Sequence, residues 1–196
     1  DVKLVQMVQL MRGGEPVKMS KRSGNFVTIA DMVDEVGRDV VRFSMLTRKP
    51  EAQMDFDFKK VIEASKDNPV FYVQYAHARI CSTIRNALKQ GLSSSPDNIA
   101  LLGDEEVALI RHAARFPREV EIAAKAREPH RIAFYLNELS ASFHSYWNLG
   151  NEDPEKRFIV GTNAQLSQAR LFLAFQFGQV IRNGLQVLGV EAVEEM

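Results

Sequence analysis

Apolar residues recur at steps of three and four along most of the chain after Thr28, and this spacing constrains the fold more than any other feature of the sequence. Such a period places the apolar side chains on one face of an α-helix. The two longest examples span residues 69–90 and 162–188, with stripes of Val70, Val73, Ala76, Ile80, Ile84 and Leu88 in the first and Leu166, Ala169, Leu173, Phe177 and Val180 in the second. Helices with one apolar face bury it against one another. The pattern therefore predicts a mainly α fold, an antiparallel α-helical bundle.

Capping and breaking residues mark the ends of the predicted helices. Thr28 opens a capping-box pattern, and Asn68 stands before Pro69 at the start of the first long helix. Other helices are predicted over residues 28–37, 38–46, 104–116, a short stretch after 117, and 129–150, with a loop over 151–161. Gly178 and Gly184 fall inside the last helix, where each glycine costs about 1 kcal/mol relative to alanine. We therefore expect close backbone packing at both glycines.

The first 27 residues follow a different pattern. A β-rich stretch over residues 2–11 is stopped by Gly13-Gly14 and resumes at Pro16-Val17, which is typical of a hairpin with a tight turn. The polar segment 18–25 that follows is predicted to be a loop. Asp1 stands where a complete chain would begin with methionine, so we expect a piece of a longer protein, in which a small strand-and-loop remnant of another domain precedes the bundle.

The charge balance narrows the possible functions. The 196 residues include 25 Lys and Arg and 25 Asp and Glu, so the formal net charge is zero. A protein that holds nucleic acid mainly by a blanket of positive charge needs a basic excess, because affinity of that kind scales with the number of phosphates neutralised. Neutrality excludes this class of binder. It does not exclude a protein that binds splayed RNA bases with a few aromatic side chains.

The remaining composition favours a reducing, cytoplasmic setting and no metal site. The single cysteine, Cys81, cannot form an intramolecular disulfide, and no charged-apolar-small leader opens the sequence. The longest apolar runs fall short of the roughly 18 residues of a membrane span. His112, His130 and His144 have no histidine or cysteine at ligand spacing, so we expect no bound metal.

Lys18-Met19-Ser20-Lys21 is the segment that carries chemistry. Two lysines three positions apart on a loop can close over a polyphosphate, with each ammonium group meeting negative oxygens. When pyrophosphate is expelled, charge builds on the leaving group, so lysines brought in at that moment stabilise the transition state more than the ground state. The charge pattern alone also fits a solvated basic turn.

The same segment resembles the second signature motif of the class I aminoacyl-tRNA synthetases, and its surroundings, residues 5–25, are similar to the arginyl branch. Asp39-Val40-Val41-Arg42 resembles the Asp-Ala-Leu-Arg box of that branch, and further matches lie at residues 55–57, 68–79, 143–148 and 184–190. The resemblance implies a C-terminal part of an arginyl-tRNA synthetase. Residues 1–50 would be the end of the catalytic domain, and residues 51–196 a helical anticodon-binding domain.

The resemblance also implies a reaction and partners. The complete enzyme would charge tRNA(Arg) with L-arginine through an arginyl-adenylate, using ATP with Mg²⁺, as a monomer in the cytoplasm. The first signature motif and the arginine pocket are absent from the sequence. We therefore expect the chain alone to be inactive and to hold no cofactor.

Residue roles carry over from the matching motif positions. The resemblance makes Lys18 and Lys21 the catalytic lysines. It gives ATP binding to Lys18, Met19, Ser20, Lys21 and Arg22. Arg22 stands where many class I enzymes have serine, and this departure leaves its role open.

The candidate RNA contacts lie near the end of the predicted helix 129–150. Phe143 and Trp147 are one helical turn apart and therefore share a face. In relatives an aromatic pair at this spacing contacts the anticodon loop together with the final methionine, so the resemblance assigns that role to Phe143, Trp147 and Met196, with Tyr146 as an alternate. Aromatic residues here also fit a bundle core. The candidates for phosphate contacts are His77, Arg79, Arg85, Arg131 and Arg182, although solvated helix faces explain most such charges.

Two other interpretations stay open. The chain could belong to another class I synthetase, for cysteine, or it could be a non-catalytic helical module that binds RNA or protein and whose lysine loop is incidental. The absence of zinc-ligand cysteines argues against the first. The run of family-like motifs in the family's order argues against the second.

Overall fold

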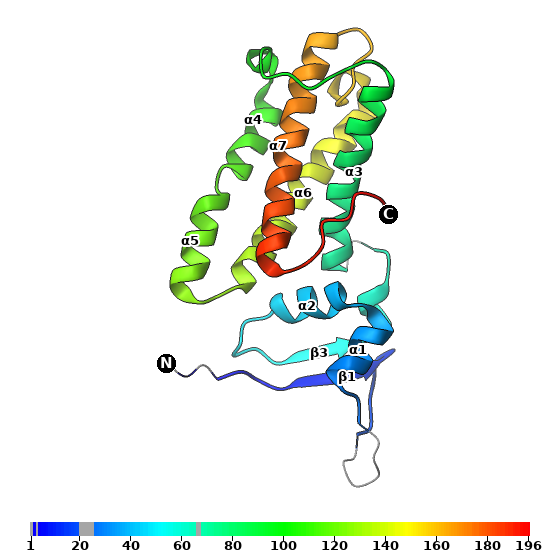
Figure 1. The fold of residues 1–196 in the computed structure, drawn as a ribbon, viewed down its shortest axis with the longest axis vertical. Helices are drawn as coiled ribbons and strands as arrows, with labels where there is room; N and C mark the ends of the chain where they lie inside the picture. Colours follow the sequence, from blue (N-terminus) through cyan, green and yellow to red (C-terminus); the bar gives the residue numbers. More distant parts are fainter. Residues whose placement is uncertain (1, 3, 20–25, 66–67) are drawn as a thin grey trace.

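A computed structural model describes residues 2, 4–19, 26–65 and 68–196 of the chain (Figure 1). In this part of the chain the bundle helices are α3 (Pro69–Lys89), α4 (Asp104–Ala113), α5 (Phe116–Ala126), α6 (His130–Glu152) and α7 (Ala164–Leu188). Helices α3 and α6 run in one direction, and α4, α5 and α7 run in the other. The predicted antiparallel bundle is confirmed. A smaller layer of strands and short helices packs against one end of it.

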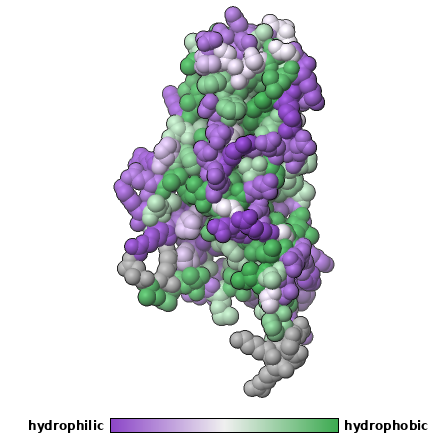
Figure 2. Space-filling view, viewed as in Figure 1, coloured by the Kyte–Doolittle hydropathy of each residue, from purple (hydrophilic) through white to green (hydrophobic). Residues whose placement is uncertain are grey.

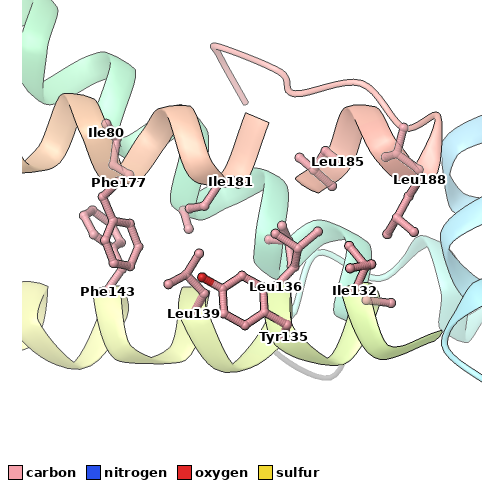
Figure 3. Close-up of a cluster of buried hydrophobic side chains, with 14 of the residues drawn as sticks. Ile80, Ile132, Tyr135, Leu136, Leu139, Phe143, Phe177, Ile181, Leu185 and Leu188 are labelled. Atoms are coloured by element: carbon pink, nitrogen blue, oxygen red, sulfur yellow. The ribbon is translucent and has the colours of Figure 1, made fainter. Parts of the chain in front are cut away.

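The core of the bundle lies between α3, α6 and α7 (Figure 3). A Cβ atom on Gly184 would lie 2.6 Å from the Leu136 side chain, and one on Gly178 would lie 3.0 Å from Ile80. Both glycines of α7 therefore allow a neighbouring helix to approach more closely than any larger residue would. This confirms the close packing predicted at these positions, which compensates for the poor helix propensity of glycine.

Two helix starts follow their sequence signals closely. Helix α1 (Ile29–Val36) begins with the Thr28 capping box, in which the Thr28 hydroxyl accepts from the Asp31 N–H at 3.1 Å and the Asp31 carboxylate accepts from the Thr28 N–H at 2.8 Å. Helix α3 begins at Pro69, and its cap Asn68 also donates to the Val61 carbonyl at 2.8 Å. Each cap satisfies backbone groups that a helix end leaves without partners.

Several predicted boundaries were wrong by a few residues. Helix α4 ends at Ala113 rather than near residue 116, α5 begins at Phe116, and α6 continues past Gly150 to Glu152. The predicted loop after α6 contains the short 3-10 helix η3 (Pro154–Lys156). Leu88, expected on the buried stripe of α3, is 61% exposed, because it lies in the last turn of the helix beyond the cover of its neighbours.

The smaller layer contains a three-stranded sheet in the order β2-β1-β3. Strand β1 (Val8–Arg12) pairs with β2 (Glu15–Pro16) as an antiparallel hairpin, and Gly13 and Gly14 turn it with positive φ angles of 63° and 88°. Two consecutive positive φ values are what a type I′ turn requires, which confirms the predicted hairpin. Residues 4–7, part of the expected β-rich stretch, lie outside the strand.

Strand β3 (Met54–Asp57) lies beyond residue 50, where the sequence suggested a domain boundary, and it pairs in parallel with β1. Its Phe56 and the following Phe58 are buried with Leu10 in a second core, separate from that of the bundle. Helix α2 (Arg38–Leu46) joins the two cores, because Val41 belongs to the second and Phe43 to the first. The short 3-10 helices η1 (Lys60–Ile62) and η2 (Ile99–Leu101) lie in the connections that flank α3.

The molecular surface mixes residue types. Hydrophilic and hydrophobic residues alternate along the bundle on the face seen in Figure 2. In the described part of the chain, none of the helices combines the length and the apolar character needed to cross a membrane. No group of three or more His, Cys, Asp or Glu side chains among the described residues is arranged to hold a metal ion.

Candidate nucleic-acid interface

The segment predicted as a loop over residues 18–25, called the lysine loop below, begins shortly after the hairpin. The Val17 N–H donates to the Leu10 carbonyl at 2.9 Å, and this bond keeps the chain beside β1 up to the first residues of the loop. Lys18 and Met19 follow and are exposed, Met19 at 49%. Three residues predicted to bind ATP lie outside the described part of the chain: Ser20, Lys21 and Arg22.

Asp57 anchors the turn of the hairpin. Its carboxylate accepts from the N–H of Gly13 at 2.9 Å, from the N–H of Gly14 at 2.7 Å and from the N–H of Lys59 at 3.0 Å. These backbone donors, with Gly13 the strongest, hold the pKa of Asp57 below its ordinary value. No local sequence pattern indicates this role of Asp57, because its partners in the turn are 43 and 44 residues away. Asp57 fixes the turn of the strand pair that leads into the lysine loop.

The aromatic residues predicted to contact the anticodon occupy different depths. Phe143 is 1% exposed and Tyr146 is 3% exposed, so both are core residues of α6. Trp147 is half-buried, and its ring centre lies 6.1 Å from that of Phe143, which confirms that the two share a face. Phe158 covers the same side, with its ring centre 5.7 Å from Phe143. Of these three aromatics of α6, Trp147 alone has its ring partly at the surface.

A basic side chain orients Trp147. The guanidinium carbon of Arg79, from α3, lies 4.3 Å from the ring centre of Tyr75 and 4.7 Å from that of Trp147. Cation–π contacts of this kind stabilise by about 0.5–1 kcal/mol at exposed sites. Arg79 also lies 3.3 Å from Nδ1 of His144, whose pKa is lowered, first by burial. A low pKa keeps the imidazole neutral beside the guanidinium.

A cavity of about 210 Å³ opens beside Trp147. This is smaller than the roughly 300–1,000 Å³ of small-molecule sites, so it fits a single ring rather than a whole nucleotide. The indole and Phe158 provide apolar wall, and the remaining lining residues are mostly polar or basic: Thr83, Asn86, Gly150, Asn151, Lys156, Arg157 and Ile159. The arrangement combines a stacking surface with hydrogen-bonding groups and positive charge.

A buried ion pair holds the wall of this cavity in place. Arg170 of α7 donates to Glu106 of α4 at 2.8 Å, and the two side chains are 6% and 1% exposed. Arg170 also donates to the carbonyl of Arg157 at 2.8 Å, while the Tyr146 hydroxyl donates to Glu106 at 2.6 Å. The charged and polar groups are thus paired, as burial requires.

The same ion pair explains two pKa shifts. Burial alone would raise the pKa of Glu106, but the hydrogen bond from Tyr146 and the charge of Arg170 outweigh it, so the net pKa is lowered. Burial raises the pKa of Tyr146, and its bond to Glu106 adds to that rise. Glu106 is therefore ionised and Tyr146 neutral at physiological pH.

The other predicted RNA contacts have varied surroundings. Met196 is 60% exposed at the end of a segment that runs beside α3. His77, Arg85 and Arg182, considered for phosphates, form hydrogen bonds with that segment instead. Arg131 pairs with Glu128 on the surface of α6. Trp147 was predicted from the sequence, but the other residues that line the cavity were missed, although Lys156-Arg157 in a polar loop was a signal that could have been followed.

Two family models match the chain. The model described as DALR anticodon binding domain matches residues 73–196, and the model described as tRNA synthetases class I (K) matches residues 5–88. The two overlap along α3. The Asp39–Arg42 segment lies in the part covered by the second.

Curated relatives are similar over the whole chain. An arginine–tRNA ligase of Novosphingobium aromaticivorans is 69% identical over 196 residues, which is 100% of this chain and 34% of that protein. One from Rhodospirillum rubrum is 53% identical over 205 residues, covering 100% of this chain and 35% of that protein. The chain thus spans about a third of the length of these relatives.

Solved structures share the fold. A Campylobacter jejuni protein assigned as an arginyl-tRNA synthetase superposes with a TM-score of 0.81 at 31% identity, over 98% of this chain and 40% of that one. The Thermus thermophilus arginyl-tRNA synthetase gives 0.77 at 28% identity, over 95% and 34%.

Proposed function

Because the chain belongs to the DALR anticodon-binding-domain family, we propose that it is the part of an arginine–tRNA ligase that holds the anticodon loop of tRNA(Arg). The observation that carries this proposal is the half-buried Trp147, which contacts the Arg79 guanidinium and lines a cavity together with polar and basic residues, within the residues that the anticodon-binding model matches. Relatives that are similar over the whole of this chain are ligases named for arginine, which favours arginine over cysteine as the amino acid. A non-catalytic module gains no support from these relatives.

In the proposed complex a base of the anticodon loop stacks on Trp147 and enters the cavity beside it. The amides of Asn86 and Asn151 line that cavity and can meet base edges, while Lys156 and Arg157 can meet phosphates. Phe143 and Tyr146 were predicted from the sequence as contacts, but their burial leaves no ring face exposed to a base. In the proposed complex they support the interface from the core of the bundle. Met196 contributes a second apolar contact at the surface.

Binding of an anticodon stem-loop RNA of tRNA(Arg) to the full-length protein tests this proposal. Stacking of one base on an aromatic side chain contributes about 1–3 kcal/mol, so Trp147→Ala should weaken binding about tenfold or more. Phe134→Ala is the matched control, since Phe134 is an aromatic residue of the same helix, 41% exposed and 13 positions away. Equal RNA affinities of the Trp147→Ala variant and the wild-type protein would contradict the proposed interface.

The lysine loop has a separate proposed role. During formation of the arginyl-adenylate, the arginine carboxylate attacks the α-phosphorus of ATP, and pyrophosphate leaves with its bridging electrons. The ammonium groups of Lys18 and Lys21 stabilise the charge that develops on this leaving group, and Met19, Ser20 and Arg22 complete the ATP contact. ATP with its Mg²⁺ is the substrate, and the arginine pocket lies in a part of the protein outside this chain.

ATP–pyrophosphate exchange by the full-length enzyme tests the lysine loop. Removing a lysine that acts mainly in the transition state should slow exchange about 100-fold in Lys21→Ala, with stem-loop affinity unchanged. Lys60→Ala, at an exposed lysine of η1, is the control. Exchange at the wild-type rate in Lys21→Ala would contradict the role.

The remaining features of the proposal concern the whole protein. It acts in the cytoplasm as a monomer, with residues 1–62 grouped with the catalytic domain and the helices from α3 onward with the anticodon-binding domain. The second core, which includes Phe56 and Phe58, supports this grouping over a division at residue 50. Sedimentation of the full-length enzyme with and without tRNA tests the stated oligomeric state.

A further inference from the structure

The C-terminal segment, residues 189–196, leaves the end of α7 and runs beside α3 (Figure 1). Gly189 ends α7 in the left-handed conformation with φ of 67°, and its N–H returns to the Gln186 carbonyl at 2.9 Å. Val190, only 4% exposed, enters the bundle core. Beyond Val190 the segment has no helix or strand of its own. Its course is therefore set by bonds to other elements.

Helix α2 holds the near end of this segment. Arg42 donates from Nε to the Leu188 carbonyl, and Arg38 donates to the Gly189 carbonyl at 3.2 Å. The Glu191 N–H donates to the Asp39 carboxylate at 2.8 Å. Three side chains of α2 thus form hydrogen bonds with the backbone of three residues within residues 188–191.

The contact with Arg42 depends on a close backbone approach. A Cβ atom on Gly189 would lie 2.7 Å from Nε of Arg42 and 3.1 Å from its guanidinium carbon. Only glycine avoids this overlap and also accepts the positive φ at no cost. Gly189 and Arg42 are therefore matched to each other across 147 residues of sequence.

Helices α3 and α7 hold the far end. Gln74 donates to the Glu191 carbonyl at 2.9 Å, and a ring nitrogen of His77 donates to the Val193 carbonyl at 2.8 Å. Past Val193, the segment is held by side chains with much solvent exposure, Arg85 at 39% and Arg182 at 44%. Exposed ion pairs typically contribute 0–1 kcal/mol each. Residues 194–196 are therefore held more weakly than the stretch up to Val193, which forms hydrogen bonds with α2 and α3.

We propose that Asp39 and Arg42 are positioning residues for RNA binding: they set the register of the C-terminal segment along α3 and thereby place Met196 at the anticodon interface. This inference rests on the proposed function, because it requires that Met196 meet RNA. It gives a physical role to the Asp39-Val40-Val41-Arg42 motif. Its two polar residues hold the segment, while Val41 is buried in the second core.

A double-mutant cycle in the full-length protein tests whether Arg42 acts through Met196. Arg42→Met should weaken stem-loop binding about five- to tenfold in the wild-type background and less than about twofold in a Met196→Ala background, since the contact it positions is then gone. Arg42 is an exposed residue, so its replacement leaves both cores intact. Arg111→Met, at an exposed arginine of α4, is the matched control and should leave affinity unchanged relative to its parent protein in each background.

Hydrogen exchange gives a second readout that needs no RNA. Asp39→Ala removes the acceptor of the Glu191 N–H, so exchange at that amide should accelerate about tenfold or more, while the amides of α3 keep their protection. Gly189→Ala should reproduce the RNA-binding defect of Arg42→Met, because the added Cβ displaces the guanidinium.

These outcomes distinguish a failure of the proposed function from a failure of the positioning role. If wild-type protein fails to bind the stem-loop, the proposed function falls and the RNA-positioning role falls with it. If wild-type protein binds but Arg42→Met and Met196→Ala act additively, only the positioning role is overturned. Unchanged exchange at the Glu191 amide in Asp39→Ala would overturn it as well.

Discussion

At the scale of single residues, Tyr146 can support the proposed RNA site without contacting RNA. Its hydroxyl donates to Glu106, which pairs with Arg170, and Arg170 donates to the carbonyl of Arg157 in the wall of the cavity. Each member of this network is buried or binds backbone, so none can change partner without leaving a polar group unsatisfied. The cavity beside Trp147 therefore depends on side chains that no base contacts.

Glu106→Gln should destabilise the protein strongly. The change leaves the Arg170 charge buried without its counter-ion, and breaking a buried pair typically costs about 3–5 kcal/mol. Urea denaturation monitored by circular dichroism measures the loss. Glu105→Gln is the control, because Glu105 is 42% exposed in its pair with Lys156 and should change the free energy of unfolding by less than about 1 kcal/mol.

The same variant carries a pH signature. The pKa of Glu106 is lowered in the folded state, so its stabilising contribution is complete above the ordinary carboxyl value of 4.5 and disappears as the pH falls through the lower folded value. The difference in unfolding free energy between wild type and Glu106→Gln should therefore be constant from pH 7 to pH 5 and shrink below 4.5. A difference that grows on acidification would contradict this assignment.

The aromatic residues of α6 show which features of the site could be predicted from the sequence: the face that a side chain occupies, but not its burial. The four-residue spacing of Phe143 and Trp147 predicted a shared face, and the ring separation of 6.1 Å confirms it. Spacing could not predict which ring is covered, because the cover comes from elsewhere in the chain. Phe158 and Phe177 both pack on Phe143, and neither has a local signal that links it to α6.

At the scale of elements, the hairpin β1–β2 and strand β3 act as one unit. Asp57, at the end of β3, receives both N–H groups of the Gly13-Gly14 turn, and the lysine loop starts three residues after that turn ends at Glu15. An anchored turn limits how far the entry to the loop can move. The position of Lys18 thus depends in part on a carboxylate in another strand.

Asp57→Ala should loosen the hairpin and slow adenylation without affecting RNA. We expect hydrogen exchange at the Gly13 and Gly14 amides to accelerate about tenfold or more and ATP–pyrophosphate exchange to fall, with unchanged stem-loop affinity. Asp55→Ala is the matched control, because Asp55 lies on the same strand and is exposed. An effect of equal size from both variants would rule out the anchoring role of Asp57.

Elements with local signals were predictable and elements without them were not. Thr28 and Asn68 cap their helices as the sequence indicated, because a cap involves residues only three apart. Strand β3 has four residues and pairs with a strand more than 40 positions away, so neither period nor turn residues revealed it. The hydrogen bonds between α2 and the C-terminal segment could not be predicted for the same reason, because their donors and acceptors are about 150 residues apart in the sequence.

At the scale of the whole molecule, neutrality and RNA binding are compatible. The chain has equal numbers of basic and acidic residues, and residues 101–196 contain more acidic than basic side chains. Positive charge is instead placed locally, with Arg79, Lys156 and Arg157 around Trp147. Affinity should therefore come mainly from stacking and hydrogen bonds, with few phosphates neutralised.

The dependence of binding on salt measures this balance. Each phosphate neutralised on single-stranded RNA adds about −0.7 to the slope of log affinity against log salt, so about three cations predict a slope near −2. Titrations of the anticodon stem-loop in KCl from low to high concentration give the slope, and Arg157→Gln should reduce its magnitude by about one phosphate. A much steeper slope would indicate a broad electrostatic interface instead.

Helix α3 is one uninterrupted helix of 21 residues, which at 1.5 Å per residue gives a rod about 30 Å long. Its first turn is capped by Asn68, which donates to the carbonyls of Val61 in η1 and of Glu63 just after it, and Arg79 lies near the middle of the helix. The helix therefore sets the distance between the sheet layer and the proposed RNA site. Inserting one residue ahead of Arg79 would advance the site by 1.5 Å and turn it by about 100°, so length and phase are fixed together in a single element.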